Sequence, residues 1–349
     1  MKKLWSEIKY WVFILFFLAV LFELVASMIL FRKYTPARSA ALHIFSNLIS
    51  KPNAEQYTYE PWLMFRLADH QSDSINISGF IRKSAPDIFI KPGSTDTLDI
   101  YFFGGNSMFG QNLSDSETIP SRFIKTCEDE MLSKCVRVKN FGIPHYYSKQ
   151  ELMLLTSLLF KGDRPDIVIF LDGLNDFYPA RMLYYDRPFF SYALQQSFEG
   201  KMLQKGRETF IDSTDQLYDD PVGITTADYN NALISKYINN IRMNARLCKA
   251  MGIKSYFFCQ PVPFYKSPSS QQYKGNFKRF DYIYPELEKN RDSISNFYFL
   301  GNMSRKEKEK EKEKERERES GDYDGVNYTP AFADKIAKEI FGTIKNDLQ

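Results

Sequence analysis

Short apolar runs alternate with helical patterns from residue 98 onward, and this alternation constrains the fold more than any other feature of the chain. Apolar runs that end in glycine or proline occur over 98–104, 136–142, 166–173 and 253–261. Helical patterns occur over 116–132, with Ser116 as the candidate N-cap, over 148–160, and over about 226–251 and 330–344. Continuous apolar runs suit strands buried on both faces. The alternation therefore predicts an α/β fold with a parallel sheet between layers of helices.

Two segments interrupt this alternation. Residues 177–225 are rich in aromatic residues and punctuated by proline and glycine, which predicts a cap insertion. Residues 305–319 alternate between basic residues and glutamate. This run has no apolar face and so cannot pack against a core. We interpret it as a charged low-complexity insert, either disordered or a solvated helix, which splits the last strand–helix unit.

A long apolar segment lies near the N-terminus. Residues 10–31 contain one charged residue, Glu23, and as a helix they would span about 33 Å, enough to cross a bilayer core of about 30 Å. We expect an uncleaved transmembrane signal anchor that follows a cytoplasmic tail of residues 1–9. A cleaved signal peptide and a buried soluble helix are the alternatives. The segment is long for a signal peptide, and no clear small-residue cleavage site follows it.

Prolines recur through the segment that follows the apolar stretch, at Pro36, Pro52, Pro61, Pro86 and Pro92. They break any long helix or strand, so we interpret residues 32–95 as an irregular N-terminal extension. The domain that carries the strand–helix alternation then covers residues 96–349.

Composition argues against two classes of function. The 46 Lys and Arg residues are nearly balanced by 43 Asp and Glu, with no one-sided basic cluster of the kind that nucleic-acid binding requires. The four cysteines fit no close-spaced metal motif, and no spacing implies a metal or a cofactor. Cys127 and Cys135 could form a disulfide or remain buried thiols, and the sequence leaves both possibilities open.

Glycine-rich and polar motifs follow the predicted strands, where ligands bind in parallel α/β sheets. These motifs are Gly-Gly-Asn-Ser-Met-Phe-Gly (104–110), Asn-Phe-Gly-Ile-Pro-His (140–145), Asp-Gly-Leu-Asn-Asp (172–176) and, before the last helix, Asp-Gly-Val-Asn-Tyr-Thr-Pro (324–330). In order and spacing they resemble the four sequence blocks of the SGNH/GDSL hydrolase superfamily, particularly its membrane-anchored bacterial members. The resemblance covers roughly residues 96–349. It implies a three-layer fold with a flavodoxin-like parallel sheet, and a domain outside the cytoplasm, periplasmic or extracellular.

The resemblance also implies roles in acyl transfer for individual residues. In that family a serine in the first block is activated by a histidine and an aspartate of the fourth block. Asp324 occupies the place of the aspartate. Backbone and side-chain N–H groups hold the developing oxyanion, and the matching donors here would be Gly142 and Asn175. Alternatively, Gly142 serves a turn that needs positive φ, and Asn175 caps a helix.

Two positions depart from the family pattern. Asn106 stands four residues before Gly110, where the nucleophilic serine is expected, and Asn327 stands at the histidine position. An amide is neither a useful nucleophile nor a base near neutral pH, so the chain is expected to be inactive or greatly weakened. Ser107 could replace the nucleophile if the turn is rewound by one residue, and His145 is a possible base.

The sequence therefore supports two hypotheses about function. The first is a membrane-anchored ester hydrolase or acyl-transfer protein that acts on an acylated glycan or lipid. The second is a binding or scaffolding protein on the same fold, which holds an ester without turning it over. The two asparagines favour the second hypothesis on chemical grounds, whereas the prevailing activity of the family favours the first.

Overall fold

The computed structural model describes residues 57–60, 62–177, 226–266, 278–303, 322–324 and 326–348. The predicted anchor at 10–31, the predicted cap beyond Phe177 and the charged run at 305–319 lie outside these ranges. No helix among the described residues combines the length and the apolar character that crossing a membrane requires.

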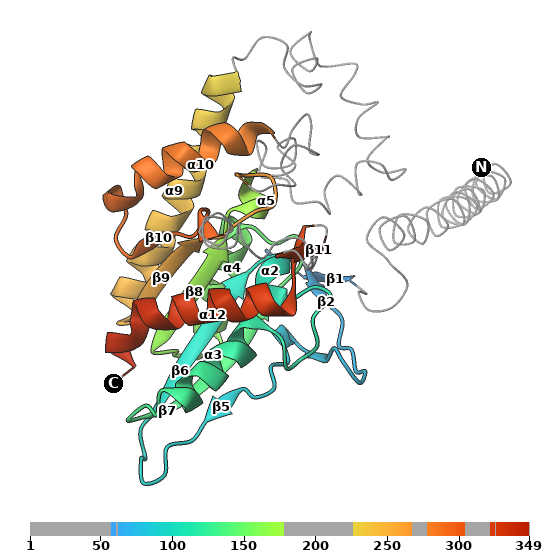
Figure 1. Ribbon diagram of the computed structural model, residues 1–349, viewed down its shortest axis with the longest axis vertical. Helices are drawn as coiled ribbons and strands as arrows, with labels where there is room; N and C mark the ends of the chain where they lie inside the picture. The colour runs from blue at the N-terminus through green and yellow to red at the C-terminus, as the bar shows by residue number, and fades with distance from the viewer. Residues whose placement is uncertain are drawn as a thin grey trace, which may run out of the picture. The chain divides into compact units, whose positions relative to one another are not determined.

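Five parallel strands form the larger part of the main sheet (Figure 1). They are β6 (Thr97–Gly104), β7 (Cys135–Gly142), β8 (Ile167–Asp172), β9 (Lys254–Cys259) and β10 (Phe297–Phe299). Their spatial order is β7-β6-β8-β9-β10, which is the flavodoxin-like order in which the second strand lies outside the first. The prediction of this sheet is confirmed for four strands, whereas β10 was missed because three residues are too short to show a pattern.

Helices cover both faces of the sheet. On one face α3 (Ile119–Asp129) and α12 (Pro330–Ile344) run side by side (Figure 1). On the other, α4 (Ser148–Phe160) contacts β6, α9 (Thr226–Ala250) contacts β9, and α10 (Phe280–Lys289) packs on α9. The helix expected over 116–132 is shorter, because Thr118 rather than Ser116 caps it: its hydroxyl accepts the Ser121 N–H.

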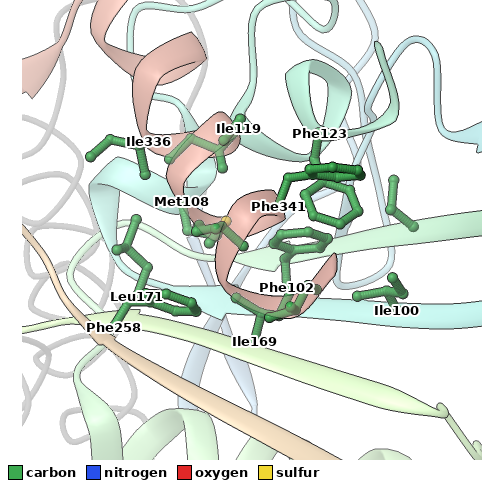
Figure 2. Packing of buried hydrophobic residues seen from close by; sticks show 14 of the residues in the cluster. Ile100, Phe102, Met108, Ile119, Phe123, Ile169, Leu171, Phe258, Ile336 and Phe341 are labelled. Carbon is green, nitrogen blue, oxygen red and sulfur yellow. The ribbon is translucent and has the colours of Figure 1, made fainter. Parts of the chain in front are cut away.

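Alternate residues of each strand supply the two halves of the core. Ile100 and Phe102 of β6 point to the side of α3 and α12, where Phe123 and Phe341 pack near them (Figure 2). On the opposite face a ladder of rings crosses the sheet, with centroids 5.1 to 5.3 Å apart from Phe141 through Phe103 and Phe170 to Phe257. These side chains explain the continuous apolar runs in the sequence.

The segment predicted to be irregular contains strands over its described part. They are β1 (Tyr57–Glu60), β2 (Met64–Leu67), β3 (Ile77–Ser78), β4 (Ile81–Arg82) and β5 (Ile88–Phe89). Both β4 and β5 pair antiparallel with β7, so the sheet is mixed rather than wholly parallel. Prolines separate these strands instead of abolishing them: Pro61 lies between β1 and β2, and Pro86 between β4 and β5. The described part of the segment, residues 57–60 and 62–95, therefore belongs to the folded domain.

Arg82 of β4 joins this segment to the first site motif. Its side chain is fully buried, forms an ion pair with Asp115 and donates to the Leu113 carbonyl at 2.9 Å. The guanidinium also lies over the Phe109 ring, 5.4 Å from the centroid.

The four cysteines are all buried free thiols, so the alternative of a Cys127–Cys135 disulfide was wrong.

Candidate functional site

The site motifs meet at the carboxyl ends of β6, β7 and β8. A one-turn helix, α2 (Asn106–Phe109), begins two residues after β6 and lies against the end of β7. This close approach requires glycine at position 142, because a Cβ atom there would lie 2.3 Å from the Phe109 backbone nitrogen. Gly105 is required for a similar reason, since its Cβ would lie 2.3 Å from the side-chain nitrogen of Asn175.

Asn106 and Asn175, predicted from separate motifs, are in contact. The Asn175 Nδ2 group donates to Asn106 Oδ1 at 3.3 Å and to the Tyr146 carbonyl at 2.8 Å. Asn175 is on α5 (Leu174–Phe177), the short helix that follows β8. The structure thus brings the predicted nucleophile position and one predicted oxyanion donor together.

The second donor to Asn106 is the backbone N–H of His145, at 2.9 Å, and not that of Gly142. The Gly142 N–H is used inside the fold, where it donates to Asn140 Oδ1 at 2.9 Å. His145 adopts a left-handed backbone conformation with φ of 67°, which directs its N–H toward α2. Sequence reasoning missed this role because a backbone donor leaves no mark on residue type. The donor role of Gly142 stays a prediction, and close packing against Phe109 is sufficient to explain the glycine.

Ser107 is 2% exposed, and its hydroxyl makes contacts away from the two donors. Its Oγ accepts from Gln260 Nε2 at 3.2 Å and also interacts with the phenol of Tyr328. These partners follow β9 and lie on β12 (Asn327–Tyr328), respectively. The hydroxyl is therefore held by neighbours on the β9 side of α2 and not by the His145 N–H or the Asn175 amide.

His145, the possible base, and Asn327, at the histidine position, have different surroundings. Burial lowers the pKa of His145 to about 4, which makes its imidazole a weak base near neutral pH. Asn327 pairs across a two-strand hairpin with Asp324 of β11 (Tyr323–Asp324). The Asn327 Oδ1 atom is buried without a hydrogen-bond partner among the described residues. β12 contacts α2, so the fourth motif lies at the same end of the sheet as the first.

Three buried carboxyl groups lie directly behind this site, and sequence reasoning missed them as a group. Glu151 of α4 and Asp172 at the end of β8 interact with each other, and the pKa of each is raised well above its usual range. For Glu151 the causes are burial, then Asp172 and Asp176; for Asp172 they are burial, then Asp176, whereas the contact with Glu151 opposes the rise. Within the described residues, both Glu151 oxygens and Asp172 Oδ1 lack a donor. A proton held between Glu151 and Asp172 would satisfy this pair, because a protonated carboxyl can donate to an ionised one.

Asp176 is the third buried carboxyl, and the protein supplies hydrogen-bond donors to its oxygens. Its oxygens accept the Ser148 hydroxyl at 2.5 Å and the Ser148 N–H at 3.3 Å. Asn240 of α9 donates to the same hydroxyl at 2.8 Å. Burial raises the pKa of Asp176 to about 6, and the bonds from Ser148 oppose this rise. Asp176 thereby fixes the start of α4 to the turn that carries Asn175.

Tyr146 connects the site to the β1–β2 hairpin. Its hydroxyl donates to the Phe65 carbonyl at 2.5 Å, and the two rings meet edge to face with centroids 5.2 Å apart. Gln150 Nε2 donates to the Leu63 carbonyl at 3.0 Å. The hairpin therefore supports the loop that presents the His145 N–H.

In the part of the chain that the structure describes, no cluster of three or more His, Cys, Asp or Glu side chains could hold a metal ion.

No family model matches the sequence, and a search of curated proteins finds no match. Several solved structures are similar. An acetyl xylan esterase aligns at 12% identity and TM-score 0.43, over 71% of this chain and 100% of its own. A lipase/acylhydrolase from Enterococcus faecalis aligns at 14% and 0.41, over 72% and 97%. A psychrotrophic esterase from Pseudoalteromonas sp. aligns at 13% and 0.39, over 72% and 98%. Because these identities and TM-scores are low, the flavodoxin-like fold rests on the strand order.

Proposed function

We propose that the chain is a membrane-anchored protein of the SGNH/GDSL ester hydrolase type, in which the site has been retained for recognition and hydrolysis has been greatly weakened. Its ligand is an acyl ester on a glycan or a lipid. The observation that carries this proposal is the position of Asn106. It stands at the nucleophile position between two N–H donors, from His145 and Asn175, and it has no hydroxyl to offer.

The retained site geometry supports an ester-binding function. Four motifs from distant parts of the sequence lie at one end of the sheet, and two of them supply converging donors to the same oxygen. Such an arrangement suits a carbonyl oxygen or an oxyanion. A domain with a purely structural role has no need for it.

The surroundings of the alternative groups support weak catalysis. The Ser107 hydroxyl is buried and hydrogen-bonded on the β9 side of α2. His145 has a pKa of about 4, and Asn327 has no basic nitrogen. Loss of a nucleophile or its base costs roughly a millionfold in kcat in the serine protease subtilisin, which leaves only binding and oxyanion effects.

The location of the protein is part of the same proposal. Residues 10–31 would anchor the chain as a single-pass transmembrane helix, with residues 32–349 outside the cytoplasm, periplasmic or extracellular. Envelope glycans and lipids are accessible to a domain in that position. Cysteine accessibility would test the orientation. A cysteine introduced at exposed Lys83 should react with a membrane-impermeant maleimide on intact cells. A lack of labelling until the cells are lysed would place the domain in the cytoplasm.

Hydrolysis of p-nitrophenyl acetate by the full chain in detergent micelles tests the chemistry. We expect the wild type and the Ser107→Ala variant to remain at background, and the double variant Asn106→Ser/Asn327→His to recover turnover. Adding Asn175→Ala to the double variant should lower that turnover roughly 100-fold, the usual effect of removing one oxyanion donor. A wild-type rate that Ser107→Ala abolishes would instead establish an active hydrolase with a rewound turn. A silent double variant would argue against an ester-hydrolase site.

A further inference from the structure

The Asn106 side chain is held in one orientation from both ends. Its Oδ1 accepts from the His145 N–H at 2.9 Å and from Asn175 Nδ2 at 3.3 Å. Its Nδ2 donates to Gln111 Oε1 at 2.7 Å. Gln111 is itself fixed, because its backbone N–H donates to the Asn106 carbonyl at 3.2 Å. The amide thus has its oxygen directed at the two donors and its nitrogen directed at Gln111.

The two donors are bound to this oxygen in the way they would bind an external one. Two N–H groups from different loops converge on a single carbonyl oxygen, which is the geometry by which proteins bind an ester carbonyl or an oxyanion. The oxygen belongs to the same chain, so it competes as an intramolecular group with a high effective concentration. An external ligand must break both hydrogen bonds before it can form its own.

We propose that Asn106 is an internal occupant of the oxyanion position, locked in place by Gln111, and that removing the amide or its lock opens this position to small carboxylates and phosphonates. The inference rests on the proposed function, because it assigns the two donors to ligand binding. It adds that the resting protein excludes a carbonyl oxygen from these donors. The substitution at position 106 would then remove oxyanion stabilisation as well as the nucleophile.

The surroundings of Asn106 favour this inference over a mere loss of the serine. Position 106 is 8% exposed, so the amide had to be accommodated inside the protein with its polar atoms bonded. A side chain that had only lost its function could have been any small residue. The partner at Gln111 is what turns the oxygen, rather than the nitrogen, toward the donors.

Calorimetric titration of the full chain in detergent micelles with methylphosphonate and with acetate tests the inference. For Asn106→Ala we expect binding at least roughly tenfold tighter than wild type, since two hydrogen bonds of about 1 kcal/mol each no longer have to be displaced. Gln111→Met keeps the length of the side chain and removes the acceptor, so it should give a smaller gain of a few fold. Asn106→Ala/Asn175→Ala should lose the gain.

Binding by folded Asn106→Ala that is no tighter than wild type would overturn the inference, with the thermal unfolding midpoint as the check on folding. The outcome separates from that of the proposed function. If the Asn106→Ser/Asn327→His variant hydrolyses ester while Asn106→Ala gains no affinity, the proposed function holds and the internal occupant is wrong. If Asn106→Ala gains affinity and the double variant stays silent, the internal occupant holds and the ester-hydrolase origin is wrong.

Discussion

Two polar clusters share the turn that follows β8, through Asn175 and Asp176, and they satisfy their buried groups in different ways. In the amide cluster, Asn106 and Asn175 bond to each other and to backbone groups, with no ionisable side chain involved. In the carboxyl cluster, Glu151, Asp172 and Asp176 are buried together, and oxygens of the first two find no donor among the residues that the structure describes. The amide cluster is neutral at every pH, whereas the carboxyl cluster depends on bound protons.

This contrast assigns different roles to the two clusters. Neutral amides can fill a buried site at small cost, because each donor meets an acceptor. Buried carboxyl groups are costly unless they are protonated or bonded, and here they fix α4 and the Asn175 turn to one another. The carboxyl cluster therefore supports the architecture, and the amide cluster occupies the site at which we propose that an ester binds.

The largest expected effect comes from removing Asp176. Asp176→Ala would leave the buried Ser148 hydroxyl and N–H without their acceptor, so we expect a loss of about 3 kcal/mol in the free energy of unfolding. Urea denaturation measures this loss. Asp129→Ala, at an exposed position near the end of α3, is the matched control and should change stability by less than about 0.5 kcal/mol. Equal effects for the two variants would contradict the assigned role.

Glu151→Gln sharpens the contrast between the clusters through its pH dependence. The folded protein raises the pKa values of the carboxyl cluster, so it binds more protons than the unfolded chain once pH exceeds about 4. Stability should therefore fall as pH rises through the folded pKa values. A glutamine side chain can donate an N–H hydrogen bond to Asp172 without first taking up a proton from solvent. We expect the slope of unfolding free energy against pH to become shallower, by up to about 1.4 kcal/mol per pH unit. Urea denaturation at pH 5, 6, 7 and 8 tests this, and parallel profiles would count against a shared proton.

Asn175→Ala should act on the amide cluster without any dependence on pH. It removes both donated bonds and leaves the Tyr146 carbonyl and Asn106 Oδ1 short of a partner, at a cost of about 2 kcal/mol. Because no titrating group takes part, the loss at pH 5 and at pH 8 should agree within about 0.5 kcal/mol. A loss that changed with pH would mean that the two clusters are coupled.

The sequence predicted most of the fold and one contact within the site, that between Asn106 and Asn175. Apolar runs and helix patterns predicted the four main strands and helices, because burial on both sheet faces leaves a strong signal. Asn106 and Asn175 were predicted from their motifs and do meet. The β3–β5 edge was missed, because two-residue strands are stabilised by their pairing with β7 and not by their own pattern.

Other site features could not be predicted, for physical reasons. The His145 N–H is a backbone group, and its direction depends on a left-handed φ that a histidine side chain does not announce. Glu151 and Asp172 are 21 positions apart, and only the packing of α4 against the sheet brings them together. Ser107 was a reasonable candidate by position, but its direction follows from the turn of α2, which places it beside Gln260.

The smallest expected effect concerns the hairpin that supports the amide cluster. Tyr146→Phe removes the hydroxyl that donates to the Phe65 carbonyl but keeps the edge-to-face ring contact, so it should cost about 1 kcal/mol. The loss should be local, because Gln150 still holds the Leu63 carbonyl. Hydrogen exchange should quicken in β1 and β2 while the amides of β6 and β8 keep their protection. Faster exchange throughout the sheet would mean that the hairpin is part of the global folding unit and not a separate support for the His145 loop.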